Sequence, residues 1–335
     1  MSAIPSSMHA LVLESHCAPL QLRELPLPRP DKGQVLVRIK ASGVNPLDIK
    51  IRLGQAAHTR TRLPAVLGID LAGVVEAVGP DVTGFQPGDE VYGMTGGVGA
   101  LQGSLAGFAA VDARLLAHKP TRLSMREAAA LPLAFITAWE GLVDRANIRP
   151  GQKVLVQGGA GGVGHIVVQL ARALGAEVFA TASSDQREFI ESLGATFIDY
   201  RATPVEDYVS RHTAGEGFDI VYDTVGGATL DASFSAVRNY VGHVVSCLGW
   251  GEHKLSPLSF RGATYSGVFT LLPMLTGKGR SHHGHILREA AKLADAGLLK
   301  PSLDPRRFTL DTVQEAHASL EKRTATGKLV IDIAS

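Results

Sequence analysis

The stretch KVLVQGGAGGVGHIVVQLARALG, residues 153–175, decides the fold of this chain. Its first five residues form an apolar run of strand type, which a glycine cluster and a run of helical spacing follow directly. Strand, glycine turn and helix is the context in which G-x-G-x-x-G, here Gly159, Gly161 and Gly164, binds a dinucleotide. A backbone without side chains can approach a pyrophosphate, and the helix N-terminus supplies unpaired N–H groups. The stretch therefore predicts a nucleotide site; the alternative is a turn that only packs a helix on a sheet.

The residues that follow the next strand candidate select the nucleotide. Residues 177–182 end at Ser183 and Ser184, where an NAD site usually has an acidic residue for the ribose 2′-hydroxyl. Small hydroxyl side chains leave room for a 2′-phosphate instead, and Arg187 could pair with that phosphate. Asp185 is the nearest acid, and we expect it to cap the next helix. The predicted cofactor is therefore NADP, bound as NADPH, rather than NAD.

In the rest of the chain, the pattern of predicted strands and helices changes near residue 125. Earlier residues form short apolar strands between Pro/Gly turns, which predicts a mostly-β region. Later strands alternate with helices, which predicts an α/β fold with a doubly wound parallel sheet. We expect a catalytic domain made of two parts, residues 8–125 and residues 269–335. A nucleotide-binding domain at residues 126–268 lies between them in the sequence. The active cleft is expected between the domains, at the carboxyl ends of the strands.

Composition narrows the function classes. The chain has 335 residues, 45% of them hydrophobic and 19% charged, which suits two folded domains rather than a disordered chain. The formal net charge of +1 gives no electrostatic reason for nucleic-acid or membrane-surface binding. No apolar run is long enough to span a bilayer. With only Cys17 and Cys247 there is no disulfide framework, so a cytoplasmic setting is expected.

Several further motifs carry a family resemblance that covers the chain from Met8 onward. They are GVNPLDIK (43–50), GIDLAG (68–73), FQPGDEVYG (85–93), QGGAGGVG (157–164), YDTVGG (222–227) and GKLV (327–330). Together they resemble the medium-chain dehydrogenase/reductase superfamily, in its zinc-independent quinone oxidoreductase and alkenal reductase branch. The resemblance implies a GroES-like mostly-β catalytic domain, a Rossmann domain and NAD(P)-dependent hydride transfer. It also implies a homodimer paired through an edge strand, for which residues 264–272 are the candidate.

The resemblance argues against a bound metal. Zinc-dependent relatives use a Cys where this chain has Asn45, and a His-Glu pair where it has Ile69 and Asp70. A catalytic zinc needs three such protein ligands. The segment Ser281-His282-His283-Gly284-His285 is the rival metal site, because three histidines lie close in sequence. We favour a solvated loop before a helix for this segment.

Without a metal, the chemistry shifts toward acceptors that are already activated, such as quinones and α,β-unsaturated carbonyls. By resemblance, Asn45 contacts the cofactor carboxamide or ribose; otherwise it is a turn residue before a proline. Lys50 could bind a developing oxyanion or donate a proton, or it could be a surface lysine in a helical turn. Asp70 could form an ion pair with Lys50 or Arg52, and Asp48 could support the turn.

The resemblance also implies a set of cofactor contacts. Residues 160–163 are expected at the pyrophosphate, and Ser183 and Tyr200 at the 2′-phosphate. Cys247 is interpreted as a small apolar residue at a strand end rather than a nucleophile, and His165 as a helix-surface residue. The full expected set is Asn45, Thr137, Gly159, Ala160, Gly161, Gly162, Val163, Ser183, Ser184, Arg187, Tyr200, Val225, Cys247, Leu248, Phe269 and Lys328.

The leading hypothesis is an NADPH-dependent oxidoreductase that transfers hydride to a small quinone or enone. A zinc-free reductase of ordinary aldehydes or ketones is the second hypothesis, and it would also oxidise simple alcohols with NADP⁺. The third is a non-enzymatic NADPH-binding or RNA-binding protein, a role that some relatives of this branch have. No basic or aromatic pattern in this chain favours the third hypothesis.

Overall fold

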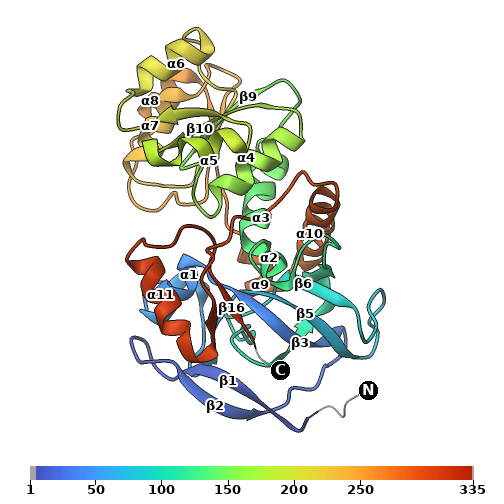
Figure 1. Cartoon of the computed structure of the whole chain (residues 1–335). Helices are drawn as coiled ribbons and strands as arrows, with labels where there is room; N and C mark the ends of the chain where they lie inside the picture. Colours follow the sequence, from blue (N-terminus) through green and yellow to red (C-terminus); the bar gives the residue numbers. More distant parts are fainter. Residues whose placement is uncertain (1–4, 334–335) are drawn as a thin grey trace. The chain divides into compact units, whose positions relative to one another are not determined.

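The computed structural model describes residues 5–333, and its contacts divide the chain into two compact units. Unit 1 contains the chain up to Leu133 and again from Leu271, and unit 2 is Ala134–Thr270. Figure 1 shows strands dominating the early, blue part of the chain and strands alternating with helices in the green to orange part. The expected α/β class, with one β-rich unit and one parallel-sheet unit, is confirmed.

Unit 2 is built on a six-stranded sheet in which all strands are parallel. The glycine turn follows the central strand, which is the doubly wound order of a dinucleotide-binding sheet. One edge strand, β14, is shorter than the expected 264–272. The strands in spatial order are β11 (Thr196–Asp199), β10 (Glu177–Ala182), β9 (Lys153–Gln157), β12 (Ile220–Asp223), β13 (His243–Ser246) and β14 (Thr264–Gly267).

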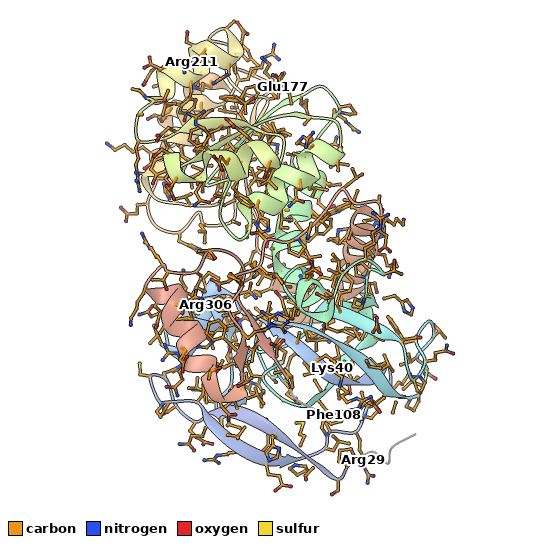
Figure 2. The ribbon with its side chains drawn as sticks, in the orientation of Figure 1. Arg29, Lys40, Phe108, Glu177, Arg211 and Arg306 are labelled. Carbon is orange, nitrogen blue, oxygen red and sulfur yellow. The ribbon has the colours of Figure 1, made fainter. Side chains whose placement is uncertain are left out.

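Helices connect these strands. An amphipathic helix buries its apolar face, and here the sheet provides the surface for it. The buried cluster of this unit combines aliphatic residues with aromatic ones such as Phe179, Tyr208 and Phe218. The charged side chains of Glu177 and Arg211 project from the outside of the unit (Figure 2). The helices and helical turns are α3 (Pro132–Trp139), η3 (Glu140–Arg145), α4 (Gly164–Ala173), η4 (Ser184–Gln186), α5 (Arg187–Ser192), α6 (Val205–Thr213), α7 (Ala228–Ala236) and α8 (Ser256–Arg261).

A wide turn at η3 has an identifiable cause. The hydroxyl of buried Tyr222 donates a hydrogen bond to the carbonyl oxygen of Thr137. In an α-helix, this carbonyl would accept from the backbone N–H four residues later. The ring occupies the space beside Gly141, where a Cβ would lie 2.3 Å from it. The helix therefore widens into a π-helical segment at this point.

Unit 1 consists of a large antiparallel-rich sheet and a small three-stranded sheet. The short apolar runs at residues 10–13, 35–41, 73–78 and 90–92, which predicted strands, all lie in strands of these sheets. The large sheet runs β15 (Phe308–Thr309), β16 (Val330–Asp332), β3 (Gln34–Gly43), β5 (Asp70–Val78), β6 (Glu90–Met94) and β8 (Leu116–His118), with β7 (Phe108–Asp112) also paired to β3; the small sheet runs β2 (Gln21–Pro26), β1 (Ser7–Leu13) and β4 (Ala65–Val66).

The helices of unit 1 include one correction. The histidine segment is not a loop, because Ser281–His285 lies inside α10. His283 is buried, and a Cβ on Gly284 would lie 2.6 Å from the carbonyl oxygen of Arg114, so this turn packs closely. The set is α1 (Pro46–Arg52), η1 (Ala57–Thr59), η2 (Ala113–Leu115), α2 (Met125–Ala129), α9 (Leu272–Thr276), α10 (Arg280–Asp295), η5 (Leu310–Thr312) and α11 (Val313–Glu321).

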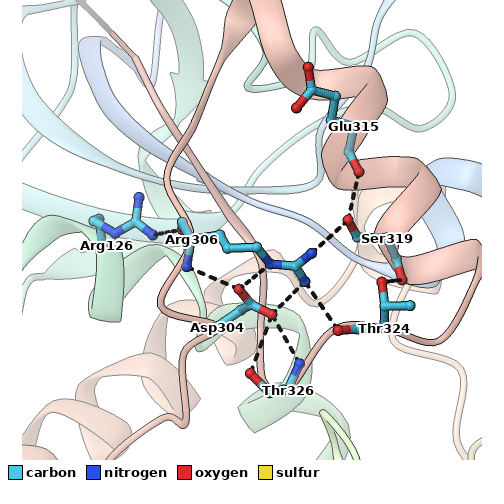
Figure 3. Close-up of polar contacts among 7 residues, drawn as sticks. All are labelled: Arg126, Asp304, Arg306, Glu315, Ser319, Thr324 and Thr326. Carbon is cyan, nitrogen blue, oxygen red and sulfur yellow. Dashed lines mark hydrogen bonds and ion pairs between the residues drawn. The ribbon is translucent and has the colours of Figure 1, made fainter.

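A polar cluster around Asp304 fixes the segment that leads into β16 (Figure 3). The buried carboxylate accepts hydrogen bonds from the guanidinium and backbone N–H of Arg306, and from the backbone N–H of Thr326. These bonds hold the pKa of Asp304 well below its ordinary range. Backbone hydrogen bonds then join Asp304 and Ser302 to Lys328. The cluster therefore sets the position of Lys328.

Candidate active site

One edge of the large sheet in unit 1 gathers four buried polar side chains. Strand β3 ends at Gly43, which pairs with Asp70 at the start of β5. Asn45 and Asp48 follow β3 at the beginning of α1, and Lys328 precedes β16, which pairs with β3 at the same edge. Their exposed fractions are 7% for Lys328 and 2% or less for the other three. Three segments far apart in the sequence thus meet at one place.

Hydrogen bonds connect this buried cluster through Asn45. Its Nδ2 donates to Asp70 Oδ2 over 2.9 Å, and its Oδ1 accepts a short hydrogen bond from Lys328 Nζ. The backbone N–H of Asn45 donates to Asp48 Oδ2 over 2.8 Å, so Asp48 does support the turn. The backbone N–H of Leu133 donates to Asp70 Oδ1. Within the described residues, Asp70 therefore takes no ion pair from Lys50 or Arg52, contrary to the expectation, because its oxygens bond Asn45 and Leu133 while Arg52 pairs with Glu321.

Burial governs the charges of the cluster. It raises the pKa of Asp48 to about 7, an effect that the hydrogen bond from Asn45 opposes and the charge of Asp70 reinforces. It also raises the pKa of Asp70 to about 6, against the attraction of Lys328. The pKa of Lys328 is lowered by burial, although both carboxylates counteract that effect. Near neutral pH, the cluster is thus poised between charge states.

This donor set does not fit a catalytic zinc. Such a site needs three His, Cys, Asp or Glu ligands, whereas Asn45 already hydrogen-bonds a carboxylate and an ammonium group and Ile69 is apolar. Across residues 5–333, no group of three or more His, Cys, Asp or Glu side chains could hold a metal ion.

The glycine turn of unit 2 has the form that a phosphate cradle needs. Gly158 has a φ of 73°, and a Cβ on Gly164 would lie 2.1 Å from the carbonyl oxygen of Gly158. Gly161 and Gly162 are exposed at the start of α4, whose N-terminus favours an anion. The residues present therefore fit a dinucleotide, whose pyrophosphate the N–H groups of this turn would hold. His165 is buried rather than on the helix surface, with Nδ1 2.8 Å from the carbonyl oxygen of Gly161.

The ends of β10 and β11 bring together a second group of residues. Ala182 and Asp199 are register partners, so Ser183 and Tyr200 follow them at the same edge of the sheet. Arg201 donates to the hydroxyl of Tyr200 over 3.2 Å and is exposed, and the sequence analysis missed it. Only a search for basic residues directly after β11 would have found Arg201.

Arg187 differs from the expectation in its surroundings. Its guanidinium pairs with Glu191 over 3.3 Å and lies 4.3 Å from the ring centre of Phe197. Asp185 does not cap α5; it lies within η4, and Gln186 occupies the cap position.

Asp223 organises the loops that follow β12 and β13. Its buried carboxylate accepts hydrogen bonds from the backbone N–H groups of Val225 and Gly226 and from the hydroxyl of Ser246. Ser246 in turn accepts from the backbone N–H of Leu248. This arrangement brings Val225 and Leu248, two of the expected cofactor contacts, to the carboxyl edge of one sheet.

The remaining expected contacts lie in several elements. Burial raises the pKa of the Cys247 thiol to about 12, so this side chain is not an activated nucleophile. Thr137 lies in α3, and Phe269 packs edge-to-face against Trp250 after β14. Lys50 is exposed in the last turn of α1, two residues after Asp48.

Comparisons with known proteins agree with this geometry. Residues 31–121 match the alcohol dehydrogenase GroES-like domain, and residues 193–331 match a family described as zinc-binding dehydrogenase. The chain is 39% identical over 333 residues to the 2-methylene-furan-3-one reductase of Solanum lycopersicum, covering 97% of this chain and 76% of the relative. The chain belongs to the medium-chain dehydrogenase/reductase superfamily, in its quinone oxidoreductase and alkenal reductase branch.

Two further relatives support membership of this superfamily. The chloroplastic NADPH-dependent alkenal/one oxidoreductase of Arabidopsis thaliana is 35% identical, with 98% of this chain and 81% of the relative covered. The crystal structure of an alcohol dehydrogenase superfamily protein from Novosphingobium aromaticivorans superposes with a TM-score of 0.96 at 57% identity, covering 98% of this chain and all of that one. As a member, the chain is an oxidoreductase that uses a nicotinamide cofactor. None of the helices within residues 5–333 has the length and apolar character to span a membrane.

Proposed function

We propose that this oxidoreductase reduces quinones or α,β-unsaturated carbonyl compounds with NADPH and without zinc. The observation that carries the proposal is the hydrogen bond between Asn45 and Asp70, with Lys328 beside it, at the positions where zinc relatives hold their ligands. A site that lacks a Lewis acid favours an acceptor that conjugation has already activated. The names of the enone and alkenal reductases among its relatives support the same substrate class.

The bound nicotinamide would supply the hydride, and the chain's own residues would handle the charge that develops on the acceptor oxygen. Asn45, oriented by Asp70 and Lys328, is the proposed contact to the carboxamide or ribose. Lys50 is the proposed partner of the acceptor oxygen, because its exposed ammonium can stabilise an oxyanion or donate a proton.

NADPH consumption tests this function directly. The assay compares a quinone and a conjugated enone with their saturated carbonyl counterparts, all with a chelator present. We expect turnover of the conjugated acceptors alone. Turnover of the saturated carbonyls would favour the aldehyde and ketone reductase instead, and loss of turnover on chelation would contradict a zinc-free site.

The role of Lys50 has its own test. Lys50→Ala should lower kcat at least about tenfold if the ammonium stabilises charge in the transition state, whereas the exposed Lys322→Ala should leave kcat unchanged. A rise in KM alone would make Lys50 a binding residue and remove it from the chemistry.

The preference for NADPH is proposed from the group at the ends of β10 and β11. Ser183, Tyr200 and Arg201 present hydroxyl and guanidinium donors, which suit a 2′-phosphate. Arg201→Gln together with Ser183→Ala should raise the KM for NADPH about tenfold or more and leave the KM for NADH unchanged. Arg187→Gln should also weaken NADPH selectively if Arg187 reaches the phosphate, whereas Arg211→Gln, an exposed arginine of the same unit, should change neither KM. Equal effects on both cofactors would contradict the phosphate assignment.

A homodimer is also proposed, through the free edge of β14. Among residues 5–333 this strand pairs with β13 alone, so its other side offers unpaired backbone groups. The N–H groups of Thr264 and Val268 donate to the β13 side, so the alternate residue Gly267 presents its N–H on the free edge. Light scattering should give twice the mass of the chain, and Gly267→Pro should lower it to one copy, because Pro removes that backbone donor. An unchanged mass would place the dimer interface elsewhere.

A further inference from the structure

A run of basic residues lies beside the buried cluster of unit 1. Between residues 49 and 69 the chain carries Lys50, Arg52, His58, Arg60 and Arg62 and no aspartate or glutamate. The whole chain has 33 Lys and Arg against 32 Asp and Glu. This local excess of positive charge is therefore a feature of the segment and not of the composition.

Three of these cations are exposed and have no protein partner. Among residues 5–333, the side chains of Lys50, Arg60 and Arg62 make no hydrogen bond or ion pair. Arg52, by contrast, pairs with Glu321 over 2.9 Å. The pKa of His58 is lowered by partial burial and then by the charge of Lys50, which shows that Lys50 lies near the loop. The three unpaired cations are called the basic triad below.

The basic triad belongs to the same sheet edge as the candidate site. Gly43 pairs with Asp70, and Asp70 pairs with Met94. Helix α1 with Lys50 therefore leaves the sheet at this edge. The loop with Arg60 and Arg62 runs through β4 toward β5 and is hydrogen-bonded to Gly99, a few residues after β6 ends at Met94. The triad thus lies on the chain segments that surround Asn45 and Asp70, rather than on a remote face.

Hydrogen bonds fix the loop that carries the two arginines. The backbone N–H of Arg62 donates to Gly99, and the backbone N–H of Gly99 donates to Thr59, both over 2.9 Å. The hydroxyl of Thr61 donates to Gly97 over 3.0 Å. Arg60 takes a left-handed backbone with a φ of 51°, which is uncommon for a residue with a side chain. These bonds hold the loop in a defined conformation, which lowers the entropy cost of binding an anion.

We propose that Arg60 and Arg62 of the basic triad form an anion-binding subsite for a phosphate group carried on the tail of a conjugated carbonyl substrate, while Lys50 serves the carbonyl end. Arginine forks match phosphate oxygens in pairs, so two arginines suit a dianion better than a monoanionic carboxylate. The carbonyl end would reach the candidate site while the phosphate remains at the loop. This inference deepens the proposed reductase function and rests on it.

The test uses a matched pair of substrates, a straight-chain alkenone with a terminal hydroxyl group and its phosphate monoester, at several chain lengths. For the wild-type protein with NADPH, we expect the ester to have a KM about tenfold or more below that of the alcohol. Arg60→Gln with Arg62→Gln should remove this advantage and leave kcat/KM for the alcohol unchanged. Arg29→Gln, an exposed arginine elsewhere in unit 1, should change neither value. Added salt should shrink the advantage.

Each other outcome is informative. Equal KM values for alcohol and ester in the wild type overturn the subsite while the reductase function stands. A double variant that raises both KM values equally shows that the loop shapes the site without binding phosphate, which also overturns it. A raised KM for NADPH assigns the loop to the cofactor instead.

If neither compound is reduced, calorimetric titration with the phosphate ester separates the two proposals. Binding that the Arg60→Gln and Arg62→Gln changes abolish supports the subsite and contradicts the reductase. Absence of binding in the wild type overturns the subsite.

Discussion

The two halves of the candidate machinery are built in opposite ways. In unit 1, Asn45, Asp70 and Lys328 form a site of buried charges. In unit 2, the turn from Gly158 to Gly164 works through the absence of side chains, and part of it is exposed. A charged group that is buried away from water needs a partner of opposite charge, whereas the glycine turn needs positions without side chains. The two sites therefore tolerate different changes.

The difference predicts that unit 1 is sensitive to the loss of charge balance. Lys328→Met leaves Asp70 and Asp48 buried without their cation. Removing one partner of a buried pair typically costs about 3–5 kcal/mol, and we expect a loss of that size in the free energy of unfolding measured with urea at pH 8. Activity should fall as well, because Asn45 loses the group that orients it.

Two controls sharpen this prediction. Lys322→Met, an exposed lysine close in sequence, should change the stability by less than about 0.5 kcal/mol. Adding Asp70→Asn to Lys328→Met should recover part of the loss, because one uncompensated charge disappears. A double variant less stable than Lys328→Met alone would show that the lysine stabilises by packing rather than by charge.

In unit 2, two glycines of the same turn should fail in different ways. A Cβ on Gly164 would lie 2.1 Å from backbone, so Gly164→Ala should cost about 1–3 kcal/mol and abolish NADPH binding. A Cβ on Gly161 would lie 3.2 Å from its nearest atom, so Gly161→Ala should fold. This variant should bind NADPH, but with an affinity about tenfold or more below that of the wild type. Thermal unfolding and fluorescence titration measure the two effects separately. Full affinity in Gly161→Ala would move the pyrophosphate away from this turn.

The same contrast explains what could be predicted from the sequence. The glycine turn and its flanking strand and helix lie within 25 residues, so their signal is local and the prediction of the parallel sheet was confirmed. The cluster around Asn45 needs three distant segments, and no pattern in any one of them showed that Lys328 would reach Asn45. The partnership of Asp70 was therefore predicted wrongly.

Errors at single residues have similar causes. The segment Ser281–His285 looked like a loop because of its polarity and its glycine, yet Gly284 is there to let α10 approach the backbone at Arg114. His165 was expected at the surface, but its ring is buried beside the turn. In both cases tertiary packing overrides a local preference.

The buried carboxyl groups also predict a dependence on pH that unit 2 does not share. The pKa of Asp48 is about 7 in the folded protein against an ordinary 3.8, so the folded state keeps a proton that the unfolded state has lost. Stability therefore falls as pH rises through this window, by up to about 1.4 kcal/mol per pH unit. Asp70, with a pKa of about 6, adds to the slope at lower pH.

Asp48→Asn tests this dependence. The amide oxygen can still accept from the backbone N–H of Asn45, but the group no longer titrates. The fall in the free energy of unfolding between pH 6 and 7 should be smaller in this variant, whereas Asp311→Asn, an exposed residue, should behave as the wild type. An unchanged slope in Asp48→Asn would assign the titration to another group.

The two cysteines give the mildest comparison of the units, because Cys17 in unit 1 is exposed and Cys247 in unit 2 is mostly covered. With a thiol pKa of about 12, Cys247 is thiolate in only about one molecule in ten thousand at pH 8. Iodoacetamide should therefore modify Cys17 in the native protein and spare Cys247, and mass spectrometry should find both modified in urea. Cys247→Ala should retain turnover. Native labelling of Cys247 as fast as Cys17 would instead reveal an accessible, activated thiol at the edge of the sheet, and loss of turnover in Cys247→Ala would then place that thiol in the chemistry.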